Sequence, residues 1–172
     1  RNVAALSFMF MCGGLLNMKR QIEYMKIALE EAQLATLEDE VPVGCVIVRE
    51  DQIIARTHNQ RDKTNNPLGH AEMLAIKRAS EVIGDWQLVN CELYVTVEPC
   101  IMCGGAIVQS RISKVVYGTP DIKGGAFGSS IDILTATNIN HRPKIIKGVL
   151  EQECSQIIKD YFKKKRNINL KK

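Results

Sequence analysis

The feature that most constrains this chain of 172 residues is a pair of short stretches, His70-Ala71-Glu72 and Pro99-Cys100-Ile101-Met102-Cys103. Imidazole nitrogen and thiolate sulfur are preferred zinc ligands. The gap between the two stretches has the length of one supersecondary unit, and each stretch is placed to open a helix. The chain must therefore fold so that the starts of two helices meet at one metal ion.

The ligand count predicts a catalytic zinc site. His70, Cys100 and Cys103 supply three ligands, which leaves one position of a tetrahedral ion open, whereas structural zinc sites fill all four. Glu72 follows two residues after the histidine and is the expected proton carrier between water and substrate. The alternative is a zinc knot that only holds the fold. That alternative needs a fourth ligand, and no further histidine stands at ligand spacing.

Hydrophobic periodicity predicts helices alternating with strands. We expect helices over residues 18–37, 70–80, 99–110, 131–134 and 151–166, and strands over residues 43–49, 53–58, 92–97, 114–117 and 144–146. This alternation predicts a layered α/β domain with one sheet and helices on both faces. Both zinc-ligand segments should then lie at one end of the sheet.

The chain divides into an N-terminal extension, residues 1–17, and a single domain, residues 18–172. The extension does not match the charged helical pattern that begins at Met18, so we expect it to be irregular and outside the fold, with a targeting role as the alternative. Apolar residues form 45% of the chain, but no run of 18 apolar residues occurs. A membrane span is therefore not expected.

Cysteine usage indicates a reducing, cytoplasmic compartment. Apart from the two zinc ligands, Cys12, Cys45, Cys91 and Cys154 are scattered without the spacing of a disulfide framework. Two of them, Cys45 and Cys91, stand in strand-like apolar runs and are expected to be buried thiols.

Positive charge is concentrated at the C-terminus. Residues 159–172 carry seven lysines and arginines against one aspartate, a net charge of +6, so the remaining residues together carry −2. A basic tail on a nearly neutral body indicates a polyanionic partner such as nucleic acid. A solvated helix end with no partner is the alternative that charge alone leaves open.

The combined pattern H-x-E with P-C-x-x-C is the signature of zinc-dependent nucleobase deaminases. The chain resembles the bacterial tRNA-specific adenosine deaminases of the cytidine-deaminase-like superfamily in particular. The resemblance rests on stretches at 40–44, 58–59, 70–72, 93–100, 102–103, 116–118, 121–129, 140–142 and 160–162, and extends over roughly nine-tenths of the chain when the first helix is included.

The resemblance implies a three-layer α/β/α fold with a central five-stranded mixed sheet, one Zn²⁺ per subunit and a homodimer. It also implies the conversion of adenosine to inosine at the wobble position of a tRNA anticodon. Carried over by position, it assigns Asn59 to the flipped nucleoside and eight further residues to the RNA: Asp121, Lys123, Asn140, His141, Tyr161, Phe162, Lys163 and Arg166. Asn140 and His141 are expected beside the anticodon-loop groove that Asp121 and Lys123 line.

One segment departs from the family pattern. The family usually has P-T-A before the zinc histidine, where this chain has Pro67-Leu68-Gly69, so the contacts of this loop with the pocket are in question.

Two other functions stay open. The runner-up function is deamination of a free base or nucleoside such as cytosine, cytidine or guanine. A non-catalytic RNA-binding subunit is a third possibility, and it would be expected to lack Glu72.

Overall fold

The computed structural model describes residues 3–169, and the side chains of residues 14–168. The elements in chain order are α1 (Val3–Leu37), β1 (Gly44–Arg49), β2 (Gln52–His58), α2 (Ala71–Ile83), β3 (Cys91–Val97), α3 (Ile101–Gln109), β4 (Lys114–Thr119), a 3₁₀ turn η1 (Ile133–Thr135), β5 (Lys144–Lys147) and α4 (Glu151–Asn169). The expected helices and strands are present, with boundaries that agree to within a few residues except at the start of α1.

The five strands form one mixed sheet in the order β2-β1-β3-β4-β5. β1 pairs with β2 and with β3 in antiparallel register, while β3, β4 and β5 are parallel. The turn between β1 and β2 has positive φ at both Glu50 and Asp51, the conformation that joins two twisted strands in a tight hairpin.

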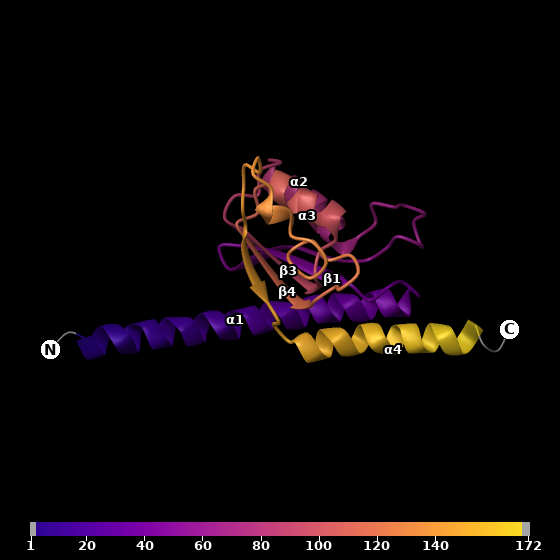
Figure 1. Cartoon of the computed structure of the whole chain (residues 1–172), viewed down its shortest axis with the longest axis horizontal. Helices are drawn as coiled ribbons and strands as arrows, with labels where there is room; N and C mark the ends of the chain where they lie inside the picture. Colours follow the sequence, from indigo (N-terminus) through magenta and orange to yellow (C-terminus); the bar gives the residue numbers. More distant parts are fainter. Residues whose placement is uncertain (1–2, 170–172) are drawn as a thin grey trace.

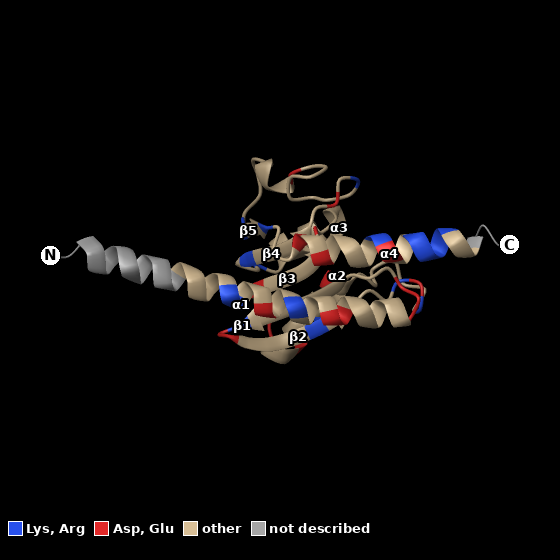
Figure 2. Ribbon diagram, turned by 90° about the horizontal axis from the view of Figure 1, so that it is seen from below, with Lys and Arg blue, Asp and Glu red and all other residues tan. Residues whose placement is uncertain are grey.

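Helices cover both faces of this sheet, which confirms the three-layer arrangement. On one face, α1 and α4 pack side by side (Figures 1 and 2) against a cluster that includes Met25, Val46 and Val116. On the other face, α2 and α3 cover a larger cluster built around Leu93 and Ile107. Because β1 and β3 are covered from both sides, almost every residue in them is buried, and neither strand alternates between apolar and polar residues.

The start of α1 differs from the expectation. The backbone of the described residues 3–17 is helical and continues directly into the predicted helix, so α1 begins at Val3 rather than near Met18. In Figure 1 this N-terminal part of α1 projects beyond the sheet. A run of residues without Pro, continuous with a stable helix, extends it at no further nucleation cost. Whether this segment belongs to the functional fold stays a prediction.

Among the described residues, none of the helices combines the length and the apolar character that crossing a bilayer requires.

The parallel arrangement of β3 and β4 decides where function can be placed. Both strands end at the same edge of the sheet, and β1 begins there because it runs antiparallel to β3. The segment that follows β3 leads to α3, and the segment that follows β2 leads to α2. We call this edge the site edge, and it is where the two zinc-ligand segments meet, as the sequence predicted.

Candidate active site

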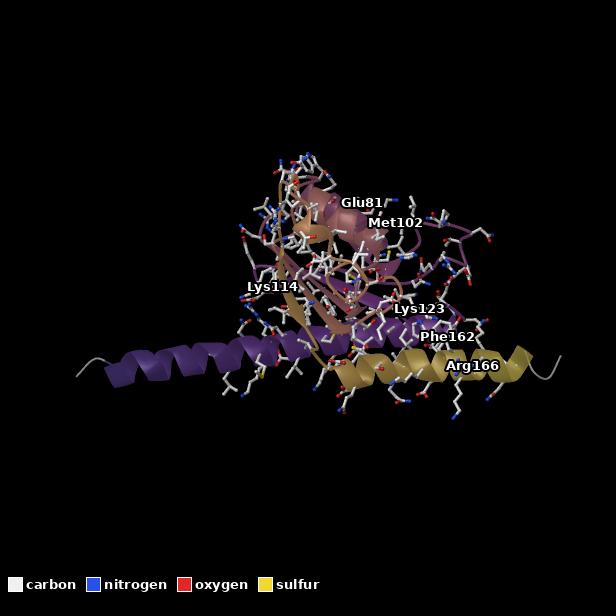
Figure 3. All side chains as sticks on the ribbon, in the orientation of Figure 1. Glu81, Met102, Lys114, Lys123, Phe162 and Arg166 are labelled. Atoms are coloured by element: carbon white, nitrogen blue, oxygen red, sulfur yellow. The ribbon has the colours of Figure 1, made fainter. Side chains whose placement is uncertain are left out.

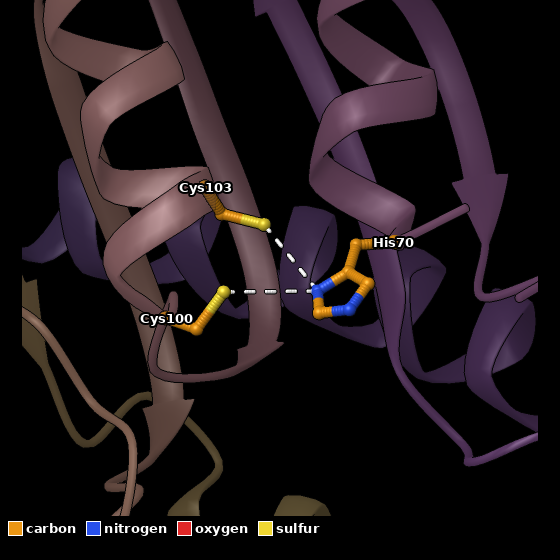
Figure 4. Close-up of side chains that lie close together, drawn as sticks. All are labelled: His70, Cys100 and Cys103. Atoms are coloured by element: carbon orange, nitrogen blue, oxygen red, sulfur yellow. Dashed lines mark hydrogen bonds between the residues drawn. The ribbon is translucent and has the colours of Figure 1, made fainter. Parts of the chain in front are cut away.

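His70, Cys100 and Cys103 come together at the site edge (Figure 4). The Nδ1 atom of His70 lies 3.7 Å from the sulfur of Cys100 and 3.6 Å from the sulfur of Cys103. His70 is the N-cap residue of α2 and Cys100 that of α3, and neither side chain caps its own helix. Both side chains therefore remain available to a metal, and two helix N-termini favour negative charge beside it.

The donor set fits a zinc ion. The three ligand atoms lie within 4.8 Å of one another, and one nitrogen with two sulfurs is a common catalytic zinc set. A hydrogen bond with Cys103 lowers the pKa of Cys100 to about 4. Cys100 is therefore a thiolate at neutral pH, which is the form that binds metals. Within residues 14–168, this is the one group of histidine, cysteine and acidic side chains with such geometry.

The predicted proton carrier faces the same place. Glu72 lies in the first turn of α2, and only 4% of it is exposed. Burial raises the pKa of Glu72 to about 6. A carboxyl group with a pKa close to neutrality can both accept and release a proton at physiological pH, which suits a general acid–base.

A pocket of about 140 Å³ opens over this cluster. Carbon-rich side chains of Val41, Val43 and Val97 line part of its wall. The remaining wall is polar or charged and is formed by seven side chains: Asn59, Arg61, His70, Glu72, Glu98, Cys100 and Asp121. The pocket thus joins apolar side chains, against which a base can lie, to the metal-ligand candidates and Glu72.

Asn59, predicted to contact the substrate, does line the pocket. It is 7% exposed, and its amide NH₂ donates to the carboxylate of Glu40 at 2.8 Å. The second oxygen of Glu40 accepts the backbone N–H of Lys63 at 2.6 Å. Glu40 therefore fixes both Asn59 and the loop that follows it. Glu40 belongs to the stretch 40–44 but received no predicted role, because only the packing shows that this acid is buried.

The unusual Leu68-Gly69 pair has a steric explanation. Leu68 is 52% exposed and does not line the pocket. A Cβ atom on Gly69 would lie 2.9 Å from Cα of Arg61, so only glycine allows the two ends of this loop to approach so closely. The backbone N–H of Gln60 also donates to the carbonyl of Gly69. The closed loop places Arg61, which the sequence analysis did not single out, at the pocket.

The two RNA-contact candidates after β4 lie in the loop 121–131. Asp121 lines the pocket, and one of its carboxylate oxygens accepts the backbone N–H of Lys123 at 3.0 Å. Lys123 is exposed beside it (Figure 3). The structure therefore places Asp121 at the pocket wall and Lys123 in the same loop, and their contact with RNA stays a prediction.

Asn140 and His141 lie elsewhere. His141 Nε2 donates to the carbonyl of Ile112 at 2.6 Å, and Asn140 accepts a hydrogen bond from Arg111. Both partners follow the C-terminal end of α3, whereas Cys100 precedes its start. The length of the helix, about 13 Å at 1.5 Å per residue, separates them from the metal ligands. Within one chain they are therefore at the opposite end of the sheet from the groove beside which we expected them.

The aromatic pair of α4 divides into two roles. Tyr161 is 7% exposed, and its hydroxyl donates to the backbone carbonyl of Asp39 at 2.9 Å, so it anchors α4 to the segment after α1. Phe162 is 43% exposed and packs edge-on against Tyr161. Of the two rings assigned to the RNA by resemblance, Tyr161 is therefore buried as an anchor in this chain, and Phe162 is the exposed one. Lys163 and Arg166 are exposed on the same helix, where Figure 2 shows a band of positive charge.

Fold and site together define the class of the protein. A cytidine-deaminase-like sheet carries a His-Cys-Cys group that could hold a metal, a buried carboxylate and a pocket over both, which is the arrangement of a hydrolytic deaminase.

Comparison with known proteins specifies this class further. The MafB19-like deaminase family model matches residues 19–166. A tRNA-specific adenosine deaminase of Bacillus subtilis is 45% identical over 143 residues, which cover 83% of this chain and 89% of the relative. The chain therefore belongs to the tRNA-specific adenosine deaminases.

Solved structures agree with this assignment. A structure from a study of A-to-I editing by tRNA:A34 deaminases is 39% identical, with a TM-score of 0.77, and covers 78% of this chain and 98% of its own. A guanine deaminase of Bacillus subtilis is 32% identical, with a TM-score of 0.55, and covers 67% and 84%. The fold is thus shared with an enzyme that acts on a free base, and the similarity is greater to the tRNA deaminase.

Proposed function

We propose that this protein converts adenosine to inosine at the wobble position of a tRNA anticodon, by hydrolysis that releases ammonia. The single observation that carries the proposal is the meeting of His70, Cys100, Cys103 and Glu72 at one pocket in a chain that belongs to this family. The A34 position is taken from the structural relative that was studied for wobble editing.

The metal in this proposal is Zn²⁺, one per subunit, held by the three ligands. When bound, such an ion acts as a Lewis acid and lowers the pKa of water to about 7. Glu72 would then move two protons in turn: its carboxylate accepts one from the attacking water and delivers it to N1 of adenine, and then accepts the second from the new hydroxyl on C6 and delivers it to the amine, which leaves as ammonia while C6 becomes a carbonyl. The apolar surroundings that raise its pKa make both transfers possible at neutral pH.

The remaining pocket residues hold the base. Asn59, whose amide NH₂ donates to Glu40, and Asp121 both line the pocket and supply polar groups to the base. A base must leave its stack to reach a pocket of this kind, and an anticodon loop presents bases without the need to open a duplex. Valine side chains at the pocket wall give the extruded base an apolar surface to lie on.

Exposed cations and an exposed ring at the site edge support RNA over a free base. Lys123, Phe162 and Arg166 lie toward the same end of the molecule in Figure 3, whereas Lys114 lies toward the other. We expect Lys123, Lys163 and Arg166 to contact phosphates. We expect the ring of Phe162 to stack on a base. A free base needs none of these groups.

The proposal includes a homodimer. α3 presents an apolar outer surface, on which Ile101 is 59% exposed and a Cβ atom on Gly105 would meet nothing within 4 Å. Ile122 and Leu68, which flank the site, are 79% and 52% exposed. A second copy that covered this surface would remove apolar area from water.

We also propose a cytoplasmic location. The five cysteines of residues 14–168 are free thiols, and Cys45 and Cys91 are buried as expected. Free thiols of this kind are typical of a reducing compartment, where tRNA is also found.

The deciding experiment measures inosine in an anticodon stem-loop with adenosine at the wobble position, with the same loop carrying guanosine as the control. Free adenosine, cytidine and guanine are tested in parallel. Inosine in the stem-loop without turnover of the free compounds supports the proposal. Turnover of guanine alone would overturn it in favour of the free-base function.

A further inference from the structure

The carboxylate of Glu98 is buried at the end of β3 and is not used by the proposed chemistry. It is 2% exposed, and its two oxygens accept three backbone N–H groups of one loop. Oε1 accepts from Phe127 at 2.9 Å and from Ser129 at 3.2 Å, and Oε2 accepts from Asp121 at 3.2 Å. A buried carboxylate is unfavourable unless it is hydrogen-bonded, and here the loop 121–131 provides all the partners.

The same loop is bound to the segment that carries the metal ligands. The backbone N–H of Ala126 donates to the carbonyl of Pro99 at 2.9 Å, and Gly125 forms an isolated antiparallel bridge with Cys100. Glu98, Pro99 and Cys100 are consecutive. Three successive residues at the end of β3 therefore hold the loop, one through its side chain and two through the backbone.

Gly125 is the position that permits this close approach. A Cβ atom there would lie 2.5 Å from Cδ of Glu98 and 2.6 Å from the carbonyl oxygen of Asp121. Real Cβ atoms do not approach so closely, so any larger residue would push the loop away from Glu98. The glycine and the carboxylate thus form one steric unit.

A second charged side chain, Lys147 at the end of β5, also holds the loop 121–131. Lys147 Nζ donates to the carbonyl of Phe127 at 2.8 Å. Phe127 is therefore fixed at its N–H by Glu98 and at its carbonyl by Lys147, and its ring is buried in the core. The loop is consequently oriented from two strands, although it has little regular structure of its own.

We infer that Glu98 is a positioning residue for substrate binding: it fixes the loop 121–131 to the Cys100 segment and thereby sets Asp121 at the pocket wall. Asp121 depends on it directly, because its own N–H is one of the three donors. Both oxygens of Glu98 accept N–H groups of the loop, and the proposed proton transfers are assigned to Glu72 instead. The identity of the substrate rests on the proposed function, whereas the hold on the loop does not.

The test replaces Glu98 by glutamine, which keeps the shape but exchanges one accepting oxygen for an NH₂ group. Amide hydrogen exchange at Asp121, Phe127 and Ser129 should accelerate roughly tenfold or more, since glutamine offers these three N–H groups one neutral accepting oxygen in place of the two of a carboxylate. The N–H of Ala126, which donates to a backbone carbonyl, should change least. Zinc content should stay the same as in the unmodified protein.

Kinetics provide the second readout. In Glu98→Gln the KM for the anticodon stem-loop should rise by roughly tenfold while kcat falls less, because the loop and not the chemistry is displaced. The matched control is Glu92→Gln on the same strand at the opposite end, where the acid accepts from Tyr94 and Lys114. That variant should leave KM and the exchange of the three amides unchanged.

A second variant approaches the same contact from the loop. Gly125→Ala leaves the carboxylate intact but forces the loop away from it, so it should reproduce both the faster exchange and the higher KM. Unchanged amide exchange in both variants, or a loss of kcat of a thousandfold in Glu98→Gln with unchanged exchange, would overturn the inference. Amide exchange is measured without substrate, so its result does not depend on whether the tRNA assignment is correct.

Discussion

At the scale of single residues, the proposed role of each group in the site depends on the groups next to it. Glu72 is buried next to the ligand cluster, where burial raises its pKa to about 6. Burying a carboxyl group destabilises the folded protein, so its presence beside the ligand cluster indicates a chemical role. Cys100 is the N-cap residue of α3, and Cys103 lies in its first turn, fully buried.

Replacing Glu72 by glutamine should abolish proton transfer while the ligands stay in place. One such transfer typically contributes roughly 10²–10⁴-fold, and Glu72 is proposed to perform two, so kcat should fall by at least that factor. Inosine formation under single-turnover conditions measures the loss. Zinc content and the thermal midpoint serve as controls and should remain close to those of the unmodified protein. A rate within a few-fold of the original would assign the proton transfer to another group.

Replacing Cys103 by alanine should remove zinc. Two of the three protein ligands remain, and the metal content per chain and the activity should both decrease strongly. Elemental analysis after dialysis against a mild chelator is the measurement. Cys91→Ala is the matched control, since Cys91 is also a fully buried thiol but lies at the start of β3, away from the site. Full zinc occupancy in Cys103→Ala would contradict the ligand assignment.

At the scale of elements, α4 serves both as structure and as a surface. Tyr161 anchors it to the segment after α1, and Lys165 adds an ion pair with Asp39 at 2.6 Å. Its other side presents Phe162 and the cations to solvent. Asp39 stands next to Glu40, which holds Asn59. The anchored end of α4 therefore lies close to the pocket.

Two neighbouring substitutions should separate these roles. Phe162→Ala removes an exposed ring, so it should leave the thermal midpoint unchanged and weaken anticodon stem-loop binding by about 1–3 kcal/mol, the value of one stacked base. Tyr161→Phe removes the hydrogen bond to Asp39, so it should lower stability by about 1 kcal/mol with little effect on binding to the folded protein. Fluorescence anisotropy and thermal unfolding measure the two effects. Equal RNA affinity for Phe162→Ala and the unmodified protein would show that this ring is not an RNA contact.

At the scale of the whole molecule, two features of the described residues are not explained by a single chain. The apolar outer surface of α3 is uncovered, and Asn140 with His141 lies at the far end of this helix from the pocket. A second copy placed against α3 would cover the first.

Sedimentation velocity at micromolar concentration should therefore show a dimer. Gly105→Arg places a charge on the outer surface of α3, where a side chain meets no atom of its own chain, so it should give a folded monomer. Leu37→Arg is the control, because Leu37 is 82% exposed at the end of α1, on the opposite layer. A fully active monomer of the unmodified protein would contradict the proposed dimer.

Local patterns in the sequence were sufficient to predict most element boundaries and to single out His70, Glu72, Cys100 and Cys103, which the structure brings together. Helix and strand periodicity depends on neighbouring residues, and the spacing of His70 to Glu72 and of Cys100 to Cys103 is itself local. Even the meeting of the two ligand segments followed from the order of elements, because parallel strands end at the same edge of a sheet. The length of α1 was missed because propagation from a neighbouring helix overrides a weak local pattern.

Only the tertiary structure decided the roles that depend on which distant residues become neighbours. Tyr161 and Phe162 are equivalent in the sequence, and the proximity of Asp39 alone makes one an anchor. Glu98 resembles any acid at a strand end until the loop 121–131 folds over it and Gly125 makes room. Burial and hydrogen-bond partners are properties of packing, so a side chain acquires them only when segments far apart in the chain come together.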